Sequence, residues 1–216
     1  MKVIDAKGRT SLTDEELKEI TTVLSEGGLI VYPTETLYGL GGDATSETAA
    51  FRTYSAKKRP YDLSLSVAVS DISMLKAIAR VDKLSERLIE SFTPGPLSLL
   101  LPKKSSLPDV IASSDRCVAF RVPDHPIITQ ILSAFGPVIA TSANLHGGEQ
   151  PINIDIAMKQ LDDFVDIYID GGPVSIGKPS TIVEISQGNL NVVRYGAVPV
   201  EKIVEVVNGL SESEVS

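Results

Sequence analysis

The sequence is poor in the residues that most often carry covalent or metal chemistry. Its 216 residues include one cysteine, Cys117, two histidines, His125 and His146, and no tryptophan. A single cysteine excludes an internal disulfide scaffold and zinc sites built on several cysteines. The spacing of the histidines gives no support to a Ser-His-Asp or Cys-His site. We therefore expect no metal ligands from the protein, and we interpret Cys117 as a small core residue.

Long apolar runs and an N-terminal targeting segment are missing as well. No stretch approaches the roughly 20 apolar residues that cross a bilayer. The first ten residues, MKVIDAKGRT, contain no apolar signal core. The sequence therefore predicts a cytoplasmic protein without membrane association.

Basic residues are fewer than acidic ones, 20 against 28, which gives a net charge of −8. Residues 151–170 carry −4 and residues 200–216 carry −3, so the excess lies mostly in two stretches. This balance opposes a generally basic surface that coats nucleic acid. A short basic run with no acid inside it comprises Arg52, Lys57, Lys58 and Arg59.

Helix and strand patterns alternate along the chain without a repeat or a break in composition. Several strands follow one another with no helix between them, which favours a mixed sheet. We expect one α/β domain over residues 1–210, with a twisted mixed β-sheet, flanking helices and a concave ligand cleft, and a frayed tail over 211–216. Helices are expected near 14–26, 46–57, 71–79, 83–92, 126–135, 155–163 and 199–208. Strands are expected near 29–32, 65–69, 97–101, 118–122, 138–141, 166–169, 181–185 and 191–195.

Two glycine patterns resemble phosphate-binding motifs but lack their context. Gly172, Gly177 and Lys178 have P-loop spacing, yet Pro179 stands where a magnesium-binding Ser or Thr is needed. The glycines within 39–44 are separated from the preceding strand, so the tight strand–turn–helix geometry is absent. We interpret both sets as turn glycines.

Polar side chains gather at the ends of the expected strands and helices. Taken singly, each is an ordinary cap or turn residue. Taken together, they describe a concave site with several cations and hydroxyls, suited to an anionic ligand. No nucleophile is evident, so positioning and charge neutralisation would carry the catalysis, as in nucleotidyl transfer. The residues are Thr36, Lys57, Arg59, Arg121, Ser142, Asn144, Ser180 and Arg194.

At the same residues the chain resembles the YrdC/TsaC family, the threonylcarbamoyl-AMP synthases. The resemblance covers about residues 14–198 and includes the family's Lys-x-Arg pair, Lys57 with Arg59, and its Ser-x-Asn pair, Ser142 with Asn144. A related branch lacks these pairs, so their presence favours the active synthases. The matching blocks are GGLIVYPTETLYGLG (27–41), KKRP (57–60), PGPLSLLL (94–101), VAFRVPDHP (118–126), ATSAN (140–144), KPSTIV (178–183) and VRYGA (193–197).

The resemblance implies a YrdC-like fold and a nucleotidyltransferase. L-threonine, bicarbonate and ATP, accompanied by Mg²⁺, would give L-threonylcarbamoyladenylate and pyrophosphate, and a separate threonylcarbamoyl transferase would then modify tRNA. Catalysis would involve the two signature pairs. By the same analogy Thr36, Arg121 and Ser180 would contact threonine. Lys57, Arg59, Asn144 and Arg194 would contact ATP, with Ser142 between the two ligands.

The chain departs from the family pattern at Leu63, at Ala68 and in the loop after Asn144. Leu63 and Ala68 stand where polar side chains are common, so backbone groups or water would have to replace their contacts. Some relatives carry a second C-terminal domain, which we do not expect in 216 residues. Two alternatives remain: a carbamoyl-adenylating module like that of hydrogenase maturation, and weak binding of tRNA or double-stranded RNA near Lys57.

Overall fold

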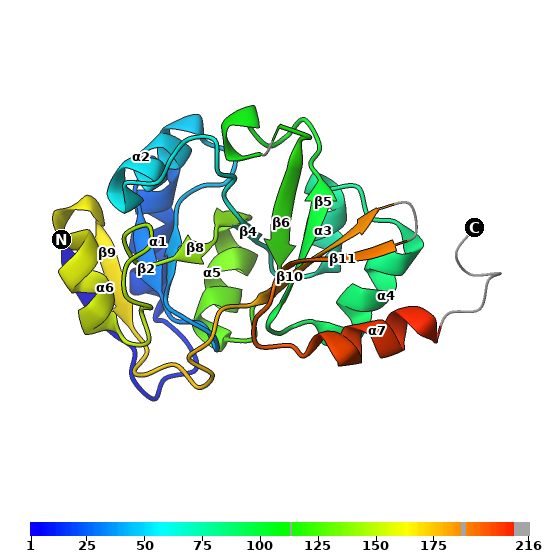
Figure 1. Cartoon of the computed structure of the whole chain (residues 1–216). Helices are drawn as coiled ribbons and strands as arrows, with labels where there is room; N and C mark the ends of the chain where they lie inside the picture. Colours follow the sequence, from blue (N-terminus) through cyan, green and yellow to red (C-terminus); the bar gives the residue numbers. More distant parts are fainter. Residues whose placement is uncertain (113, 187–188, 210–216) are drawn as a thin grey trace.

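The computed structural model describes residues 1–112, 114–186 and 189–209, and the expected tail at 211–216 lies outside them. The α/β class, the mixed strand directions and the flanking helices are confirmed. Within the described residues the strands divide into two sheets where one was expected. Figure 1 shows the two sheets side by side, with α5 (Pro126–Phe135) between them.

The five-stranded sheet has helices on both faces. On one side α1 (Asp14–Ser25) and α5 contribute buried Ile20, Leu24, Ile128 and Ile131 to a common core. On the other side α6 (Ile154–Leu161) packs with residues of the inner strands. The expected capping box is present, because Thr13 and Glu16 satisfy each other's backbone N–H groups. The strand order is β1 (Lys2–Asp5), β9 (Ile167–Asp170), β2 (Ile30–Tyr32), β3 (Gly39–Gly41) and β8 (Thr141–Ser142).

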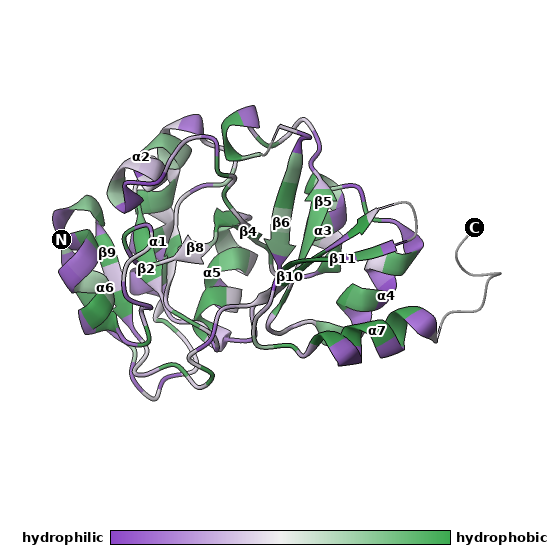
Figure 2. Cartoon of the chain, in the orientation of Figure 1, coloured by the Kyte–Doolittle hydropathy of each residue, from purple (hydrophilic) through white to green (hydrophobic). Residues whose placement is uncertain are grey.

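The six-stranded sheet has one packed face and one open face. Side chains such as Leu99, Phe120 and Val183 join the main core, together with α2 (Glu47–Lys57), α3 (Ile72–Ile78), α4 (Lys83–Phe92) and α7 (Val200–Asn208). Figure 2 shows hydrophilic residues along the outer sides of α4 and α7. Alternate strand residues point to the opposite face. The strand order is β11 (Asn189–Arg194), β10 (Thr181–Ser186), β5 (Leu97–Pro102), β6 (Cys117–Arg121), β4 (Val67–Ala68) and β7 (Val138–Ile139).

The segment expected as a strand at 138–141 is where the chain passes from one sheet to the other. Val138 and Ile139 form β7 in the larger sheet, whereas Thr141 and Ser142 form β8 in the smaller one. Between them the Ala140 N–H donates to the Ser66 carbonyl at 2.8 Å. This step carries Ser142 and the residues after it to the junction of the two sheets.

The interpretation of Gly39 and Gly41 as turn glycines is wrong, because both lie in β3. The ring of Tyr32 on β2 lies against them. A Cβ atom would come within 2.5 Å of the Tyr32 ring at Gly39 and within 2.7 Å at Gly41. Gly172 and Gly177 have φ values of +85° and +68° and are turn glycines, as expected.

The N-terminal strand β1 was also missed, because its pattern in the sequence is only four residues long. It pairs in parallel with β9, which belongs to the other end of the chain. The helices among residues 1–112, 114–186 and 189–209 lack the length and apolar character needed to cross a membrane.

Candidate active site

A cavity of about 590 Å³ opens between the two sheets and brings the sequence-predicted residues together. Its walls come from both sheets and from the end of α2. Its lining also includes residues outside the predicted set of site residues, among them Thr34, Ser98 and His146. All eight predicted residues line it: Thr36, Lys57, Arg59, Arg121, Ser142, Asn144, Ser180 and Arg194.

Lys57 is the last residue of α2 and is 2% exposed. Its ammonium group donates to the backbone carbonyls of Ser142 at 2.5 Å and Asn144 at 2.6 Å, and Asn144 Oδ1 lies 3.4 Å away. These three oxygens are neutral. Burial, and to a lesser extent the charge of Arg59, therefore lower the pKa of Lys57 to about 7.

The backbone reverses directly after Lys57, which brings Arg59 to the same wall. Lys58 has a left-handed conformation with φ at 48°. The Lys58 N–H donates to the Ser55 carbonyl and the Arg59 N–H to the Tyr54 carbonyl. This is the hydrogen-bond pattern of a Schellman motif, which usually has glycine at the left-handed position. The side chain of Lys58 is exposed, so the turn separates its charge from those of its two neighbours.

Backbone carbonyls hold the Arg59 guanidinium. Its guanidinium donates to the carbonyl of Ser64 at 2.8 Å and to that of Leu63 at 3.4 Å. His146 Nδ1 lies 3.5 Å from Arg59 Nη1. Burial lowers the pKa of Arg59. Leu63 contributes its backbone carbonyl to Arg59, and Ala68 lines the cavity with an apolar methyl group, so the replacement of polar contacts at these two positions stays a prediction.

The Ser142–Asn144 segment is fixed by its own side chains. Ser142 Oγ donates to Asn144 Oδ1 at 2.6 Å, and Asn144 Nδ2 donates to the Gly148 carbonyl at 3.0 Å. The same segment supplies the oxygens that hold Lys57. Lys57 of the first signature pair and both residues of the second therefore form one connected hydrogen-bond network.

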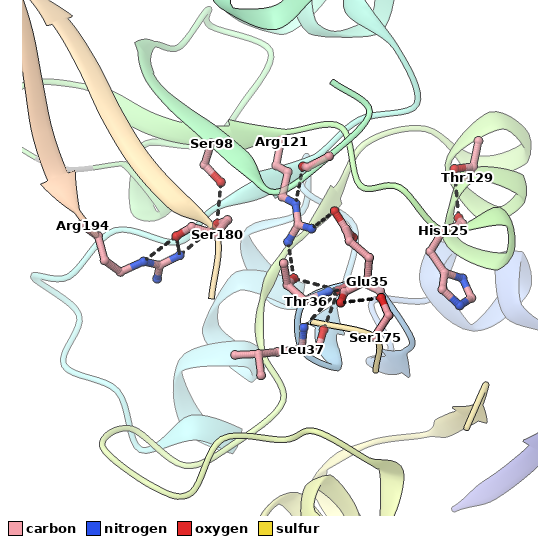
Figure 3. Close-up of polar contacts among 12 residues, drawn as sticks. Glu35, Thr36, Leu37, Ser98, Arg121, His125, Thr129, Ser175, Ser180 and Arg194 are labelled. Atoms are coloured by element: carbon pink, nitrogen blue, oxygen red, sulfur yellow. Dashed lines mark hydrogen bonds and ion pairs between the residues drawn. The ribbon is translucent and has the colours of Figure 1, made fainter. Parts of the chain in front are cut away.

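Arg121 points into the cavity from β6, and Figure 3 shows its guanidinium between Glu35 and Thr36. It donates to Thr36 Oγ1 at 2.7 Å and to the Gly95 carbonyl at 3.1 Å. Its Nη2 forms an ion pair with Glu35 Oε1 at 2.5 Å, and the two side chains are only 12% and 10% exposed. The charge of Arg121 is thus largely compensated by a neighbour that the sequence reasoning missed. An arginine inside an apolar strand, together with an acid beside Thr36, was the available signal.

Arg194 reaches across to Ser180 from the neighbouring strand (Figure 3). Its guanidinium donates to the Ser180 carbonyl at 2.9 and 3.1 Å and to the Ser180 hydroxyl at 2.9 Å. That hydroxyl lies 2.9 Å from Ser98 Oγ. Burial, followed by the charges of Arg121 and Arg59, lowers the pKa of Arg194.

Three cations of the cavity lack an acidic partner. Within the described part of the chain, Lys57, Arg59 and Arg194 take part in no ion pair, whereas Arg121 does. Partly buried cations that contact only neutral oxygens attract an anion strongly, because little solvent screens them. The geometry is that of a polyanion site next to the Thr36–Arg121–Ser180 group.

Comparison with known proteins identifies the family of this chain. The Sua5/YciO/YrdC family model, described as "Telomere recombination", matches residues 22–196. The chain belongs to the Sua5/YciO/YrdC family. The match agrees with the span of about 14–198 over which the sequence resembles its members.

Relatives in the Sua5/YciO/YrdC family differ in length. A protein of Methanocaldococcus jannaschii is 34% identical over 196 residues, which cover 89% of this chain and 93% of that protein. The threonylcarbamoyl-AMP synthase of Pyrococcus abyssi is 32% identical over 92% of this chain, but the match spans only 59% of the relative.

Solved structures confirm the fold. The P. abyssi Sua5 structure complexed with L-threonine superimposes with a TM-score of 0.90 at 32% identity, over 95% of this chain and 61% of that one. The Escherichia coli YciO structure has a TM-score of 0.83 at 26% identity, over 94% of this chain and 98% of that one. The family fold is therefore shown over nearly the whole described chain.

Proposed function

We propose that this protein is an L-threonylcarbamoyladenylate synthase, which uses L-threonine, bicarbonate and ATP and releases pyrophosphate. The observation that carries the proposal is the group of three uncompensated cations, Lys57, Arg59 and Arg194, beside the smaller polar group around Arg121. A triphosphate suits the first group and an amino acid the second. The named P. abyssi relative and its threonine complex support the same assignment.

The chemistry needs no protein nucleophile. Threonine and bicarbonate first give N-carboxy-threonine and water. An oxygen of its N-carboxylate then attacks the α-phosphorus, the bond to the bridging oxygen of the β-phosphate breaks, and the electron pair of that bond leaves with pyrophosphate. Negative charge grows on the phosphate oxygens, where fixed cations stabilise the transition state most. In this assignment Lys57, Arg59, Asn144 and Arg194 bind the phosphates. Thr36, Arg121 and Ser180 orient threonine, and Ser142 lies between them.

Magnesium is proposed as part of the MgATP substrate. Proteins usually hold Mg²⁺ with one or two carboxylates together with substrate phosphates. Among the described residues that line the cavity, only Asp115 carries a carboxylate, and the residues around Lys57 supply cations, hydroxyls and an amide. This donor set suits a metal that arrives already bound to the nucleotide.

The test is pyrophosphate release with each substrate omitted in turn. We expect release only when threonine, bicarbonate and MgATP are all present, with the adenylate detected by mass spectrometry. Release that does not depend on threonine would contradict the proposal. Exchange of pyrophosphate into ATP that depends on carbamoyl phosphate would support the hydrogenase-maturation alternative instead.

Nucleotide binding should be coupled to proton uptake at Lys57. The pKa of Lys57 is about 7 in the free protein because the group is buried without a counter-charge. Phosphate charge favours the ammonium form, so binding raises this pKa. Affinity for ATP should be greatest below pH 7 and fall as the pH rises above 7. Calorimetry at pH 8 in buffers of different ionisation enthalpy should report proton uptake, and equal heats in all buffers would argue against it.

The product is proposed to pass to a separate threonylcarbamoyl transferase that modifies tRNA. Binding of tRNA or double-stranded RNA near Lys57, and the cytoplasmic location, stay predictions. Lys57 and Arg59 line the cavity, which favours a small anion over a nucleic-acid backbone at these two residues.

A further inference from the structure

A second cavity, of about 680 Å³, adjoins the candidate active site. Pro123 lines both cavities, so the segment that follows Arg121 separates them. The other walls of the second cavity come from the start of α3, the C-terminal end of α4 and α5. A cavity of this size accommodates a small organic molecule.

The second cavity has an apolar floor and an acidic rim. Ile89 and Val122, on the floor, are only 3% and 6% exposed. Three exposed acids line the rim, Asp71, Glu90 and Asp124, and the lining contains no lysine or arginine. An apolar body therefore suits the floor, and a positive charge suits the rim.

Most other polar groups of this lining are already engaged within the protein. Its helix hydroxyls donate to backbone carbonyls one turn earlier, as Thr129 does to His125 (Figure 3). The Gln130 amide exchanges hydrogen bonds with the backbone of Leu12. His125 Nδ1 accepts from the Ile127 N–H at 3.3 Å, and burial lowers the pKa of His125. The imidazole is therefore neutral at pH 7 and adds no positive charge to the cavity.

Two of the three carboxylates are available to a cation. Asp71 is the N-cap of α3, and its two oxygens accept from the Met74 N–H at 2.9 Å and from Ser70 Oγ at 2.7 Å. In the part of the chain that the structure describes, the side chains of Glu90 and Asp124 form no hydrogen bond and no ion pair. A ligand can therefore pair with them without displacing a protein group.

We propose that the second cavity binds a small organic cation, an amine or guanidinium carried on an apolar body. The body packs on Ile89 and Val122, and the cation pairs with Glu90 or Asp124. An ion pair at an exposed rim raises affinity by at most about fivefold, so the apolar body supplies most of the binding. The enclosed floor suits a free molecule better than the flat face of a protein partner. This site uses neither ATP nor threonine, so it does not depend on the proposed function.

The experiment adds 3-phenylpropylamine, 3-phenylpropanol or propylamine to the full chain without substrates. Two-dimensional NMR follows the methyl groups of isoleucine, leucine and valine. We expect 3-phenylpropylamine to cause saturable shifts at Ile72, Ile89 and Val122, which line the second cavity. The alcohol lacks the charge and should bind about three- to tenfold more weakly. Propylamine lacks the ring and should bind at least about tenfold more weakly.

A pair of double variants isolates the role of the rim. Glu90→Gln with Asp124→Asn keeps the side-chain shapes but removes both charges, so the preference for the amine over the alcohol should fall to under about twofold. The matched control, Glu201→Gln with Glu205→Gln, removes two exposed acids of α7 that do not line the second cavity. It should keep the wild-type preference.

Three results would overturn the proposal. The first is the absence of saturable shifts at the methyl groups of the second cavity. The second is shifts at Leu100 and Ile182 instead, which would place the amine in the candidate active site. The third is the same amine preference in the wild type and in the Glu90→Gln, Asp124→Asn variant. Because no substrate is present, a protein without synthase activity could still show the expected pattern, and the two proposals can fail separately.

Discussion

Lys57→Ala is expected to lower kcat/KM for ATP by about 10²–10³-fold, the usual loss when one fixed donor to a charged transition state is removed. Lys57 contacts only neutral oxygens, so its charge is free to act on phosphate. Steady-state pyrophosphate release at saturating threonine measures the effect. We expect most of the loss in kcat, because charge builds up on the phosphate oxygens in the transition state.

The neighbouring residue provides a matched control for this variant. Lys58→Gly removes the same charge one residue away, from an exposed side chain, and places glycine where φ is 48°. It should keep activity within about twofold, because the left-handed conformation suits glycine. Equal losses in Lys57→Ala and Lys58→Gly would mean that the general positive charge of the segment matters more than the position of Lys57.

Most of the candidate site could be predicted from the sequence, because its residues stand at the ends of strongly patterned elements. Lys57 and Arg59 flank a helix end marked by Pro60, and Arg121 interrupts an apolar strand. The sequence did not show which groups each of these side chains contacts. Lys57 is held by backbone carbonyls of Ser142 and Asn144, and backbone carbonyls carry no signature in the sequence.

The division into two sheets was hidden for a related reason. Apolar patterning marks residues 138–141 as extended, but it does not say which strands they pair with. Register is set by tertiary partners, and here Thr141 pairs with Leu40 while Val138 pairs with Ala68. The glycines of β3 suggested a turn for the same reason. They are needed because the Tyr32 ring packs against them, and that contact cannot be seen in the sequence.

Removing the acid that the sequence reasoning missed should have the largest effect on stability. Glu35→Ala leaves the Arg121 guanidinium, 12% exposed, without its counter-charge. Breaking one side of a buried ion pair typically costs about 3–5 kcal/mol, most of it from the remaining uncompensated charge. Urea unfolding followed by circular dichroism should show this decrease in the free energy of unfolding. A loss below about 1 kcal/mol would mean that water reaches Arg121 and screens it.

A second pair of variants separates charge from packing. Glu35→Gln keeps the shape of the side chain and an acceptor oxygen, so it should cost less than Glu35→Ala. The double variant Glu35→Leu with Arg121→Met replaces the pair by apolar groups and should recover much of the stability, because desolvation of two charges is avoided. Activity should not recover, since Arg121 and its hydrogen bond to Thr36 are gone. The double variant would then be stable but inactive. That result would show that Glu35 supports catalysis by holding Arg121 in position.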